Sequence, residues 1–271
     1  MSLIIHTIVP EGIVVCADTR TTHRDGKGHV QYDDTAEKIV PFPNRIVVSH
    51  CGDAKVRENL TVMQFLYDIR KKYGKQTTID DLPLKILNEY FRVNGNGCTI
   101  FKISGYFEFG RTACTYTIDT AKSSIVLSTE MGSYGASYNG ITDVAHAIMN
   151  SGIDYKNLSL ANAISLTRGC LLENINVFQY HAEQSIGGAC QTYIIDIMHD
   201  SAGWYQDDGE VKPDTDAPSD ALWKLQCCSR RSGRGLRMHR YGDCSTTSTI
   251  QSSTIATLWK LTSRNSCWMT M

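Results

Sequence analysis

The sequence predicts an α+β fold in which packed sheets are covered by helices on both faces. The first observation is the order of the expected elements, which runs strands, two helices, strands, two helices and strand. Such an order does not suit a doubly wound parallel sheet, in which strands and helices alternate. The second is that 42% of the 271 residues are hydrophobic, which is enough for a large buried core. The third is a change of composition near residue 206, so we predict a domain at 1–205 and a linker with a C-terminal extension at 206–271.

Strands are expected in the first fifty residues where apolar runs meet turn residues. They cover residues 4–9, 12–19, 38–40 and 45–49. Pro10-Glu11-Gly12 separates the first pair, and the segment from Pro41 to Asn44 separates the second pair, which predicts a hairpin there. A polar stretch rich in Asp, Gly and His lies between the two pairs, at 22–35.

The later elements follow from hydrophobic spacing and capping residues. A long helix is expected at 54–73, with Asp53 as its N-cap and apolar side chains at steps of three and four residues. A second helix is expected at 79–91, with Pro83 in its first turn. The remaining expected elements are strands at 98–104, 115–119, 124–129 and 189–197, helices at 142–149 and 159–179, and a small-residue turn at 132–140.

The residues beyond the predicted domain have a different character. Residues 207–220 are acidic and contain proline, as linkers do, and the chain after Trp223 is rich in Arg, Ser, Thr and Cys without a sustained period. Its arginines would suit a nucleic acid or an acidic partner, but charge runs are more often simply solvated. These arginines are Arg230, Arg231, Arg234, Arg237 and Arg240.

Composition excludes several classes of function. The formal net charge of −1 gives no global field that would attract nucleic acid, so that partner is not expected. No apolar run approaches the ~20 residues that span a bilayer, and no export signal is visible, so we expect a cytoplasmic protein. The ten cysteines form no CxxC pair, which leaves no metal-ligand spacing and favours reduced, buried thiols.

The opening segment, MSLIIHTIVPEGIVVCADTRTT, resembles the start of a mature proteasome β-subunit. In that family a nucleophilic residue opens the first strand, and the second strand ends in a Gly-Val-Val-x-x-Ala-Asp-x-Arg pattern. Gly12, Asp18 and Arg20 stand at the matching places, and counting back from Asp18 puts Ser2 at the nucleophile position. The family usually has Thr there, so Ser2 is a departure that keeps the hydroxyl.

A nucleophile at the chain terminus carries its own base. A neutral α-amine titrates near pH ~8, so it can accept the hydroxyl proton without a separate histidine. This chemistry requires that Met1 is removed, which a small second residue such as Ser2 permits. The alternative is that Ser2 is an ordinary surface residue at the N-terminus.

The segment TAEKIVPFPNRIVVSHCGDA gives a second match. By resemblance, Lys38 places a cation beside the nucleophile and lowers its proton affinity, and Asp18 pairs with this lysine and orients it. Gly52 would offer a backbone N–H for an oxyanion hole. The simpler interpretations are an edge-strand lysine, a strand-end acid paired to Arg20 and a turn glycine.

Two further segments match less fully. In STEMGSYGASYNGI, Ser133 aligns with a family serine that organises the terminal amine, although Tyr134 replaces a glycine. In HAEQSIGGACQTYIIDI, Glu183 would replace the family aspartate, and Ile186 stands where serine is usual. The alternatives are a plain turn serine and a solvated acid at a helix end.

The resemblance also suggests where a substrate binds. Thr22 would supply backbone hydrogen bonds to an extended peptide, which adds to the protein as a strand. The residues expected around the side-chain pocket are Thr21, Val40, His50 and Ala54. A rival nucleophile, Cys51 next to His50, is disfavoured because neighbouring strand residues point to opposite faces.

Together these matches cover roughly residues 2–200 and imply a four-layer αββα sandwich. They imply a proteasome-like N-terminal-nucleophile hydrolase that cleaves amide bonds through an acyl-enzyme, without metal or cofactor. The expected partners are a peptide or unfolded protein substrate and further copies of the chain in a homo-oligomeric ring or a related assembly. The alternatives are a non-catalytic structural subunit of the same fold and an amidase or acylase that acts on a small amide.

Overall fold

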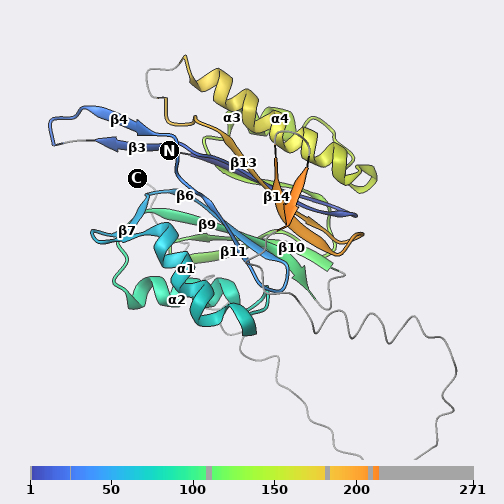
Figure 1. Cartoon of the computed structure of the whole chain (residues 1–271), viewed down its shortest axis with the longest axis horizontal. Coiled ribbons are helices and arrows are strands. Elements are labelled where there is room, and N and C mark those ends of the chain that lie inside the picture. The colour runs from blue at the N-terminus through green and yellow to red at the C-terminus, as the bar shows by residue number, and fades with distance from the viewer. Residues whose placement is uncertain (1, 25, 108–111, 181–183, 207–209, 214–271) are drawn as a thin grey trace, which may run out of the picture. The chain divides into compact units, whose positions relative to one another are not determined.

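The computed structural model describes residues 2–24, 26–107, 112–180, 184–206 and 210–213. The fold is mixed α/β and is built on two larger antiparallel sheets (Figure 1). The first sheet has six strands in the order β12-β1-β2-β13-β14-β15. Their bounds are Gly135–Gly140, Leu3–Val9, Gly12–Asp18, Cys190–Asp196, Ser201–Tyr205 and Val211–Pro213.

The second sheet has five strands in the order β11-β10-β9-β6-β5. Their bounds are Ser124–Thr129, Thr112–Asp119, Thr99–Phe107, Ile46–Gly52 and Ile39–Phe42. Two small hairpins complete the strands, one from β3 (Thr21–Arg24) and β4 (Val30–Asp33), the other from β7 (Lys55–Arg57) and β8 (Leu60–Thr61).

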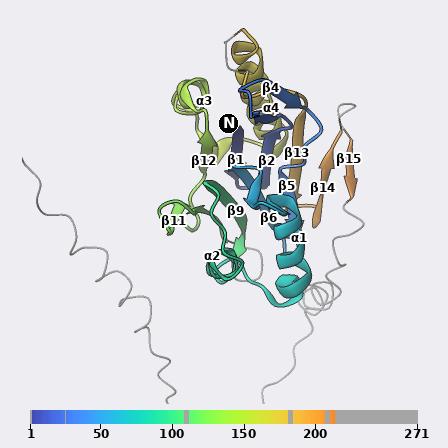
Figure 2. The same cartoon turned by 90° about the vertical axis from the view of Figure 1, so that its left-hand side faces the viewer.

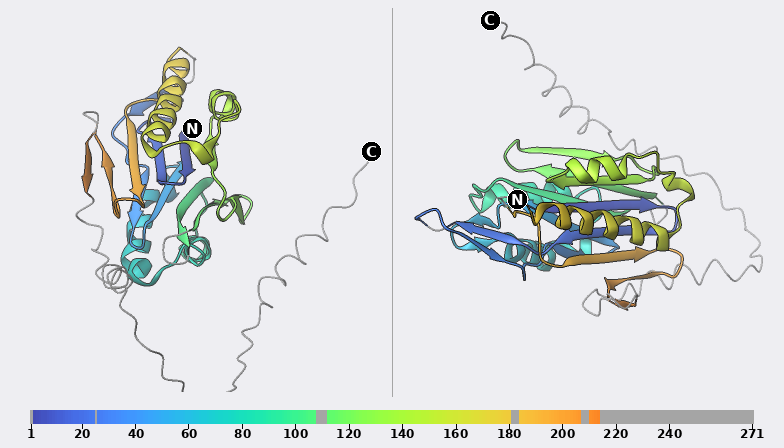
Figure 3. Two further views of the ribbon diagram at one scale, coloured as in Figure 1. Left: turned by 90° about the vertical axis from the view of Figure 1, so that its right-hand side faces the viewer. Right: turned by 90° about the horizontal axis from the view of Figure 1, so that it is seen from above.

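Each larger sheet carries a pair of helices on one face. Helices α1 (Val62–Tyr73) and α2 (Leu82–Arg92) pack on the second sheet through an apolar core that includes Phe65 and Tyr90 (Figure 2). Helices α3 (Asp143–Met149) and α4 (Leu160–Phe178) pack on the first sheet, and α4 lies along β1, β2 and β13 (Figure 3). Short 3-10 helices cover Gly74–Gln76 and Tyr155–Asn157.

A third apolar core joins the two sheets. Ile4 and Ile8 of β1 belong to this core, whereas Leu3 and Ile5 belong to the core under α3 and α4. The alternation follows from the period of two in a strand, which points successive side chains to opposite faces. Because both faces of β1 are covered, all seven of its residues are buried, and Leu3, which follows Ser2, is held inside the molecule.

Two expectations about the elements are wrong, and a stretch for which no element was expected contains a hairpin. Helix α1 begins at Val62 and not near residue 54, because Thr61 is the N-cap and accepts a hydrogen bond from the Gln64 N–H. The preceding residues form β7 and β8. The polar stretch 22–35 holds most of the β3–β4 hairpin, and the expected turn at 132–140 contains β12, which pairs with β1. None of the helices in the described ranges is long and apolar enough to cross a membrane.

Candidate active site

Ser2 lies at the start of β1 and is only 6% exposed. Its carbonyl accepts a hydrogen bond of 3.1 Å from the Ile141 N–H, just beyond β12. Gly140 has a φ of +112°, and a Cβ at this position would collide with the same carbonyl. The glycine therefore permits the close approach that holds Ser2 at the edge of β12.

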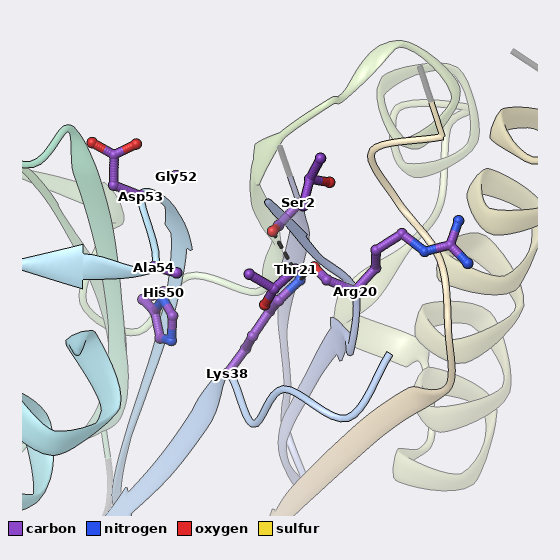
Figure 4. A pocket seen from close by; sticks show the side chains of 9 residues that line it. Ser2, Arg20, Thr21, Lys38, His50, Gly52, Asp53 and Ala54 are labelled. Carbon is purple, nitrogen blue, oxygen red and sulfur yellow. Dashed lines mark hydrogen bonds between the residues drawn. The ribbon is translucent and has the colours of Figure 1, made fainter. Parts of the chain in front are cut away.

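Lys38 directly precedes β5 and brings three oxygen atoms together (Figure 4). Its Nζ donates to Ser2 Oγ at 2.8 Å, to Asp18 Oδ1 at 2.9 Å and to the Arg20 carbonyl at 2.6 Å. An ammonium group has three donors, so every N–H of Lys38 has an acceptor although its side chain is only 3% exposed.

Asp18 ends β2 and is completely buried. Besides Lys38, its Oδ1 accepts from the Leu3 N–H at 2.9 Å, and its Oδ2 accepts from the Arg20 and Gly187 N–H groups at 3.3 Å each. These donors fix the carboxylate and tie β2 to the first residues of β1. The ion pair is therefore anchored from several segments of the chain.

Burial acts on both members of this pair. It lowers the pKa of the Lys38 ammonium below its ordinary value, while the adjacent Asp18 carboxylate acts in the opposite direction. Burial likewise raises the pKa of Asp18, against Lys38 and the backbone donors. A cation that donates to the Ser2 hydroxyl favours loss of the hydroxyl proton, because it stabilises the alkoxide that results.

Ser2 and Lys38 open onto a cavity of about 150 Å³. Figure 4 shows Ser2, Lys38 and Thr21 on one side of it and His50 and Ala54 on the other. The lining residues are Ser2, Arg20, Thr21, Thr22, Lys38, His50, Gly52, Asp53 and Ala54. Nearly all of the residues expected for catalysis or substrate binding in the first 54 positions thus meet at one cavity.

The structure places the other expected residues elsewhere. Val40 is buried in the core with α1 and α2 and does not line the cavity. Ser133 is exposed beyond the β12 end that pairs with Ile8, whereas Ser2 lies beside Gly140 at the opposite end. Ser133 was expected beside the amine of Ser2, but the pairing of β12 with β1 places it far from Ser2. Glu183 lies outside the described residues.

Cys51 and His50 do not form the rival site. Cys51 is buried in the core between the two sheets, and burial raises the pKa of its thiol to about 12. His50 lines the cavity instead, as expected for neighbouring residues of a strand. A thiol that stays protonated and points away from the cavity is a poor nucleophile.

Several residues of the site were not expected from the sequence. Arg20 pairs with Asp34 through its Nε at 2.6 Å and its Nη2 at 2.8 Å, which draws its guanidinium away from the cavity (Figure 4). Gly187 packs so closely against that guanidinium that a Cβ at this position would require the Arg20 side chain to shift. A signal for Gly187 did exist, because the segment IGGACQT carries adjacent glycines. Asp34 gave no such signal, because it is one of many polar residues in the stretch 22–35.

No group of His, Cys, Asp and Glu residues within the described part of the chain could hold a metal ion. A scan of the chain against protein-family models found no match. A search among curated proteins found no match either.

Proposed function

We propose that this chain is a proteasome-like N-terminal-nucleophile hydrolase that cleaves amide bonds with Ser2 after Met1 is removed. One observation supports it above the others: the Nζ atom of Lys38 lies within hydrogen-bond distance of both Ser2 Oγ and Asp18 Oδ1. A hydroxyl at the start of the chain, a buried cation against it and a carboxylate behind the cation are the parts that this chemistry needs.

The proposed reaction has two stages. The Ser2 Oγ attacks the substrate carbonyl, and its proton passes to the α-amine that Ser2 exposes once Met1 has left. Lys38 stabilises the developing alkoxide, and Asp18 keeps Lys38 in position. When the tetrahedral intermediate collapses, the carbon–nitrogen bond breaks and the leaving amine takes the proton. Water then attacks the ester on Ser2, releases the acid and restores the hydroxyl.

Gly52 is the proposed oxyanion donor. It ends β6 with a φ of +98° and lines the cavity that Ser2 opens onto. A Cβ at this position would collide with the Cys98 carbonyl, which excludes larger residues. This fits a residue whose backbone, and not its side chain, faces the substrate.

We assign the fold to the four-layer αββα sandwich of this family. Three apolar cores support this assignment, one under α1 and α2, one between the sheets and one under α3 and α4. The proposal extends to a peptide or unfolded protein as substrate, to assembly of identical chains into a ring or a related oligomer, and to a cytoplasmic location.

Mass spectrometry of the intact chain with an electrophilic peptide, such as a peptide vinyl sulfone, tests the proposal. We expect a chain that lacks Met1 and gains one adduct on Ser2. Ser2→Ala abolishes the adduct, and Ser133→Ala, which removes an exposed serine at the other end of β12, keeps it. Retention of Met1 or an unchanged adduct in Ser2→Ala contradicts the proposal.

A further inference from the structure

The cavity wall opposite Ser2 holds polar atoms without partners. His50 is 6% exposed, and neither of its ring nitrogens makes a hydrogen bond of good geometry to a described residue, although the Glu37 backbone lies near the ring. The same holds for the Thr22 Oγ1, and both residues line the cavity. Buried polar atoms are nearly always paired, because an unpaired one loses its hydration without compensation. These atoms are therefore available to pair with a ligand that enters the cavity.

The charge state of His50 defines what that ligand offers. Burial and the nearby Lys38 cation lower the pKa of the imidazole to about 3, and the Glu37 backbone opposes this only weakly. The ring is therefore neutral near pH 7 and presents one N–H donor and one lone-pair acceptor. The Thr22 hydroxyl likewise both donates and accepts.

The cations around the cavity are already engaged. Lys38 is paired with Asp18, and Arg20 is paired with Asp34 and stacked over the Tyr32 ring at 4.8 Å. Both Lys38 and Arg20 therefore already have an acidic partner, and neither is available to neutralise an acidic side chain of a substrate. A volume of about 150 Å³ is sufficient for a group of roughly six heavy atoms.

We propose that this cavity selects a substrate side chain that ends in a primary amide, so that the enzyme cleaves next to Gln or Asn. This inference rests on the proposed hydrolase function of Ser2. An amide carries both donors and an acceptor, so it can pair with His50 and Thr22 together. An aliphatic side chain leaves both unpaired. A carboxylate offers no donor to the imidazole lone pair and meets the Asp53 carboxylate, which also lines the cavity. An ammonium group offers no acceptor to the imidazole N–H and meets the charge of Lys38.

Four peptide vinyl sulfones, identical except for Gln, Leu, Glu or Lys at the position next to the electrophile, test the inference. On the full chain without Met1, the rate of adduct formation on Ser2 is expected to be at least about tenfold higher for Gln than for the other three. His50→Leu and Thr22→Val each reduce that preference, and His50→Leu favours the Leu probe. His199→Leu is the matched control, because His199 is an exposed residue outside the cavity.

The outcomes separate the two proposals. If no probe reacts at Ser2, the hydrolase function fails and the specificity fails with it. If Ser2 reacts but the Leu, Glu or Lys probe is as fast as the Gln probe, only the specificity is overturned. A Gln preference that survives in both His50→Leu and Thr22→Val also overturns it. Since Thr22→Val preserves the shape of the side chain, a folding defect in His50→Leu does not remove the test.

Discussion

Lys38 and Asp18 act as one unit, because neither charge has another ionic partner at comparable distance within the described ranges. A buried ion pair adds little net stability, since desolvation offsets most of the attraction. Removing one partner is costly, however, because it leaves the other charge buried alone. This asymmetry allows the effect of the pair on stability to be separated by mutation from its proposed role in catalysis.

Lys38→Met is expected to lower the free energy of unfolding by roughly 3–5 kcal/mol and the labelling rate of Ser2 by at least about 100-fold. The double variant Asp18→Asn with Lys38→Met regains part of the stability, because no charge remains buried, but none of the rate. Urea unfolding and probe labelling of the parent chain, Lys38→Met, Asp18→Asn and the double variant measure both effects. If the double variant labels at the parent rate, the role of Lys38 is wrong.

Lys102 of β9 is a second buried lysine, and it has no ion pair in the part of the chain that the structure describes. It is 1% exposed, and its Nζ donates to Thr117 Oγ1 at 3.0 Å and to Ser137 Oγ at 2.5 Å. Burial lowers its pKa to about 7. In the unfolded chain a lysine titrates near ~10.4. Between these values the unfolded state binds more protons than the folded state, so stability rises with pH.

Between pH 7 and pH 10 the free energy of unfolding of the parent chain is therefore expected to rise by roughly 3 kcal/mol more than that of Lys102→Met. Denaturant unfolding at several pH values measures the two slopes. Lys122→Met serves as the control, because Lys122 is an exposed lysine whose removal leaves the slope of the parent. Equal slopes for the parent and Lys102→Met would show that Lys102 is charged in the folded chain.

Elements with apolar runs could be predicted from the sequence. The strands β1, β2, β5, β6 and β13 lie close to their expected positions, since burial on both faces gives near-continuous hydrophobic runs. The β3–β4 hairpin and β12 could not be found in this way, because β4 is exposed throughout and β12 consists of small and polar residues. They depend on pairing with partner strands, which no local pattern records.

Gly140, the last residue of β12, allows a test of how this strand positions Ser2. Gly140→Ala is expected to abolish labelling of Ser2 or reduce it by at least about 100-fold, because the new Cβ would displace the Ser2 carbonyl from its place beside the strand. The matched control is Gly152→Ala, whose φ of +81° is also positive but whose Cβ would meet open space. It loses about 1 kcal/mol of stability and keeps its labelling. Equal labelling of the two variants would exclude Gly140 as a constraint on Ser2.

For the whole molecule, the residues of the site come from segments that are distant in the sequence. Ser2, Asp18, Lys38 and Gly52 were found because they are spaced along the first 52 residues in a familiar order. Ser133 was misplaced because its assignment depended on the register between β12 and β1, and the residues beside Ser2 are Gly140 and Ile141. Register is set by tertiary pairing, so a motif alone does not determine it.

Truncation of the chain tests the predicted division into a domain at 1–205 and a C-terminal extension. A chain that ends at residue 213 is expected to keep the midpoint of thermal unfolding within a few degrees and to keep the labelling of Ser2. The physical reason is that the three apolar cores draw their residues from positions 3–205. Calorimetry and adduct mass measure the two properties, and native mass spectrometry compares the oligomers of both chains. Loss of folding in the shorter chain would show that residues 214–271 belong to the domain.

The burial of β1 between β12 and β2 decides how the protein should be purified. An affinity tag ahead of Ser2 would convert its amine into an amide, which is not basic, so under the proposed mechanism the preparation would be inert however well it folded. Tags therefore belong at the C-terminal end. Where an N-terminal fusion is needed for expression, it should be cut by a protease that leaves no residue before Ser2, so that the proposed nucleophile gains its free amine at that step.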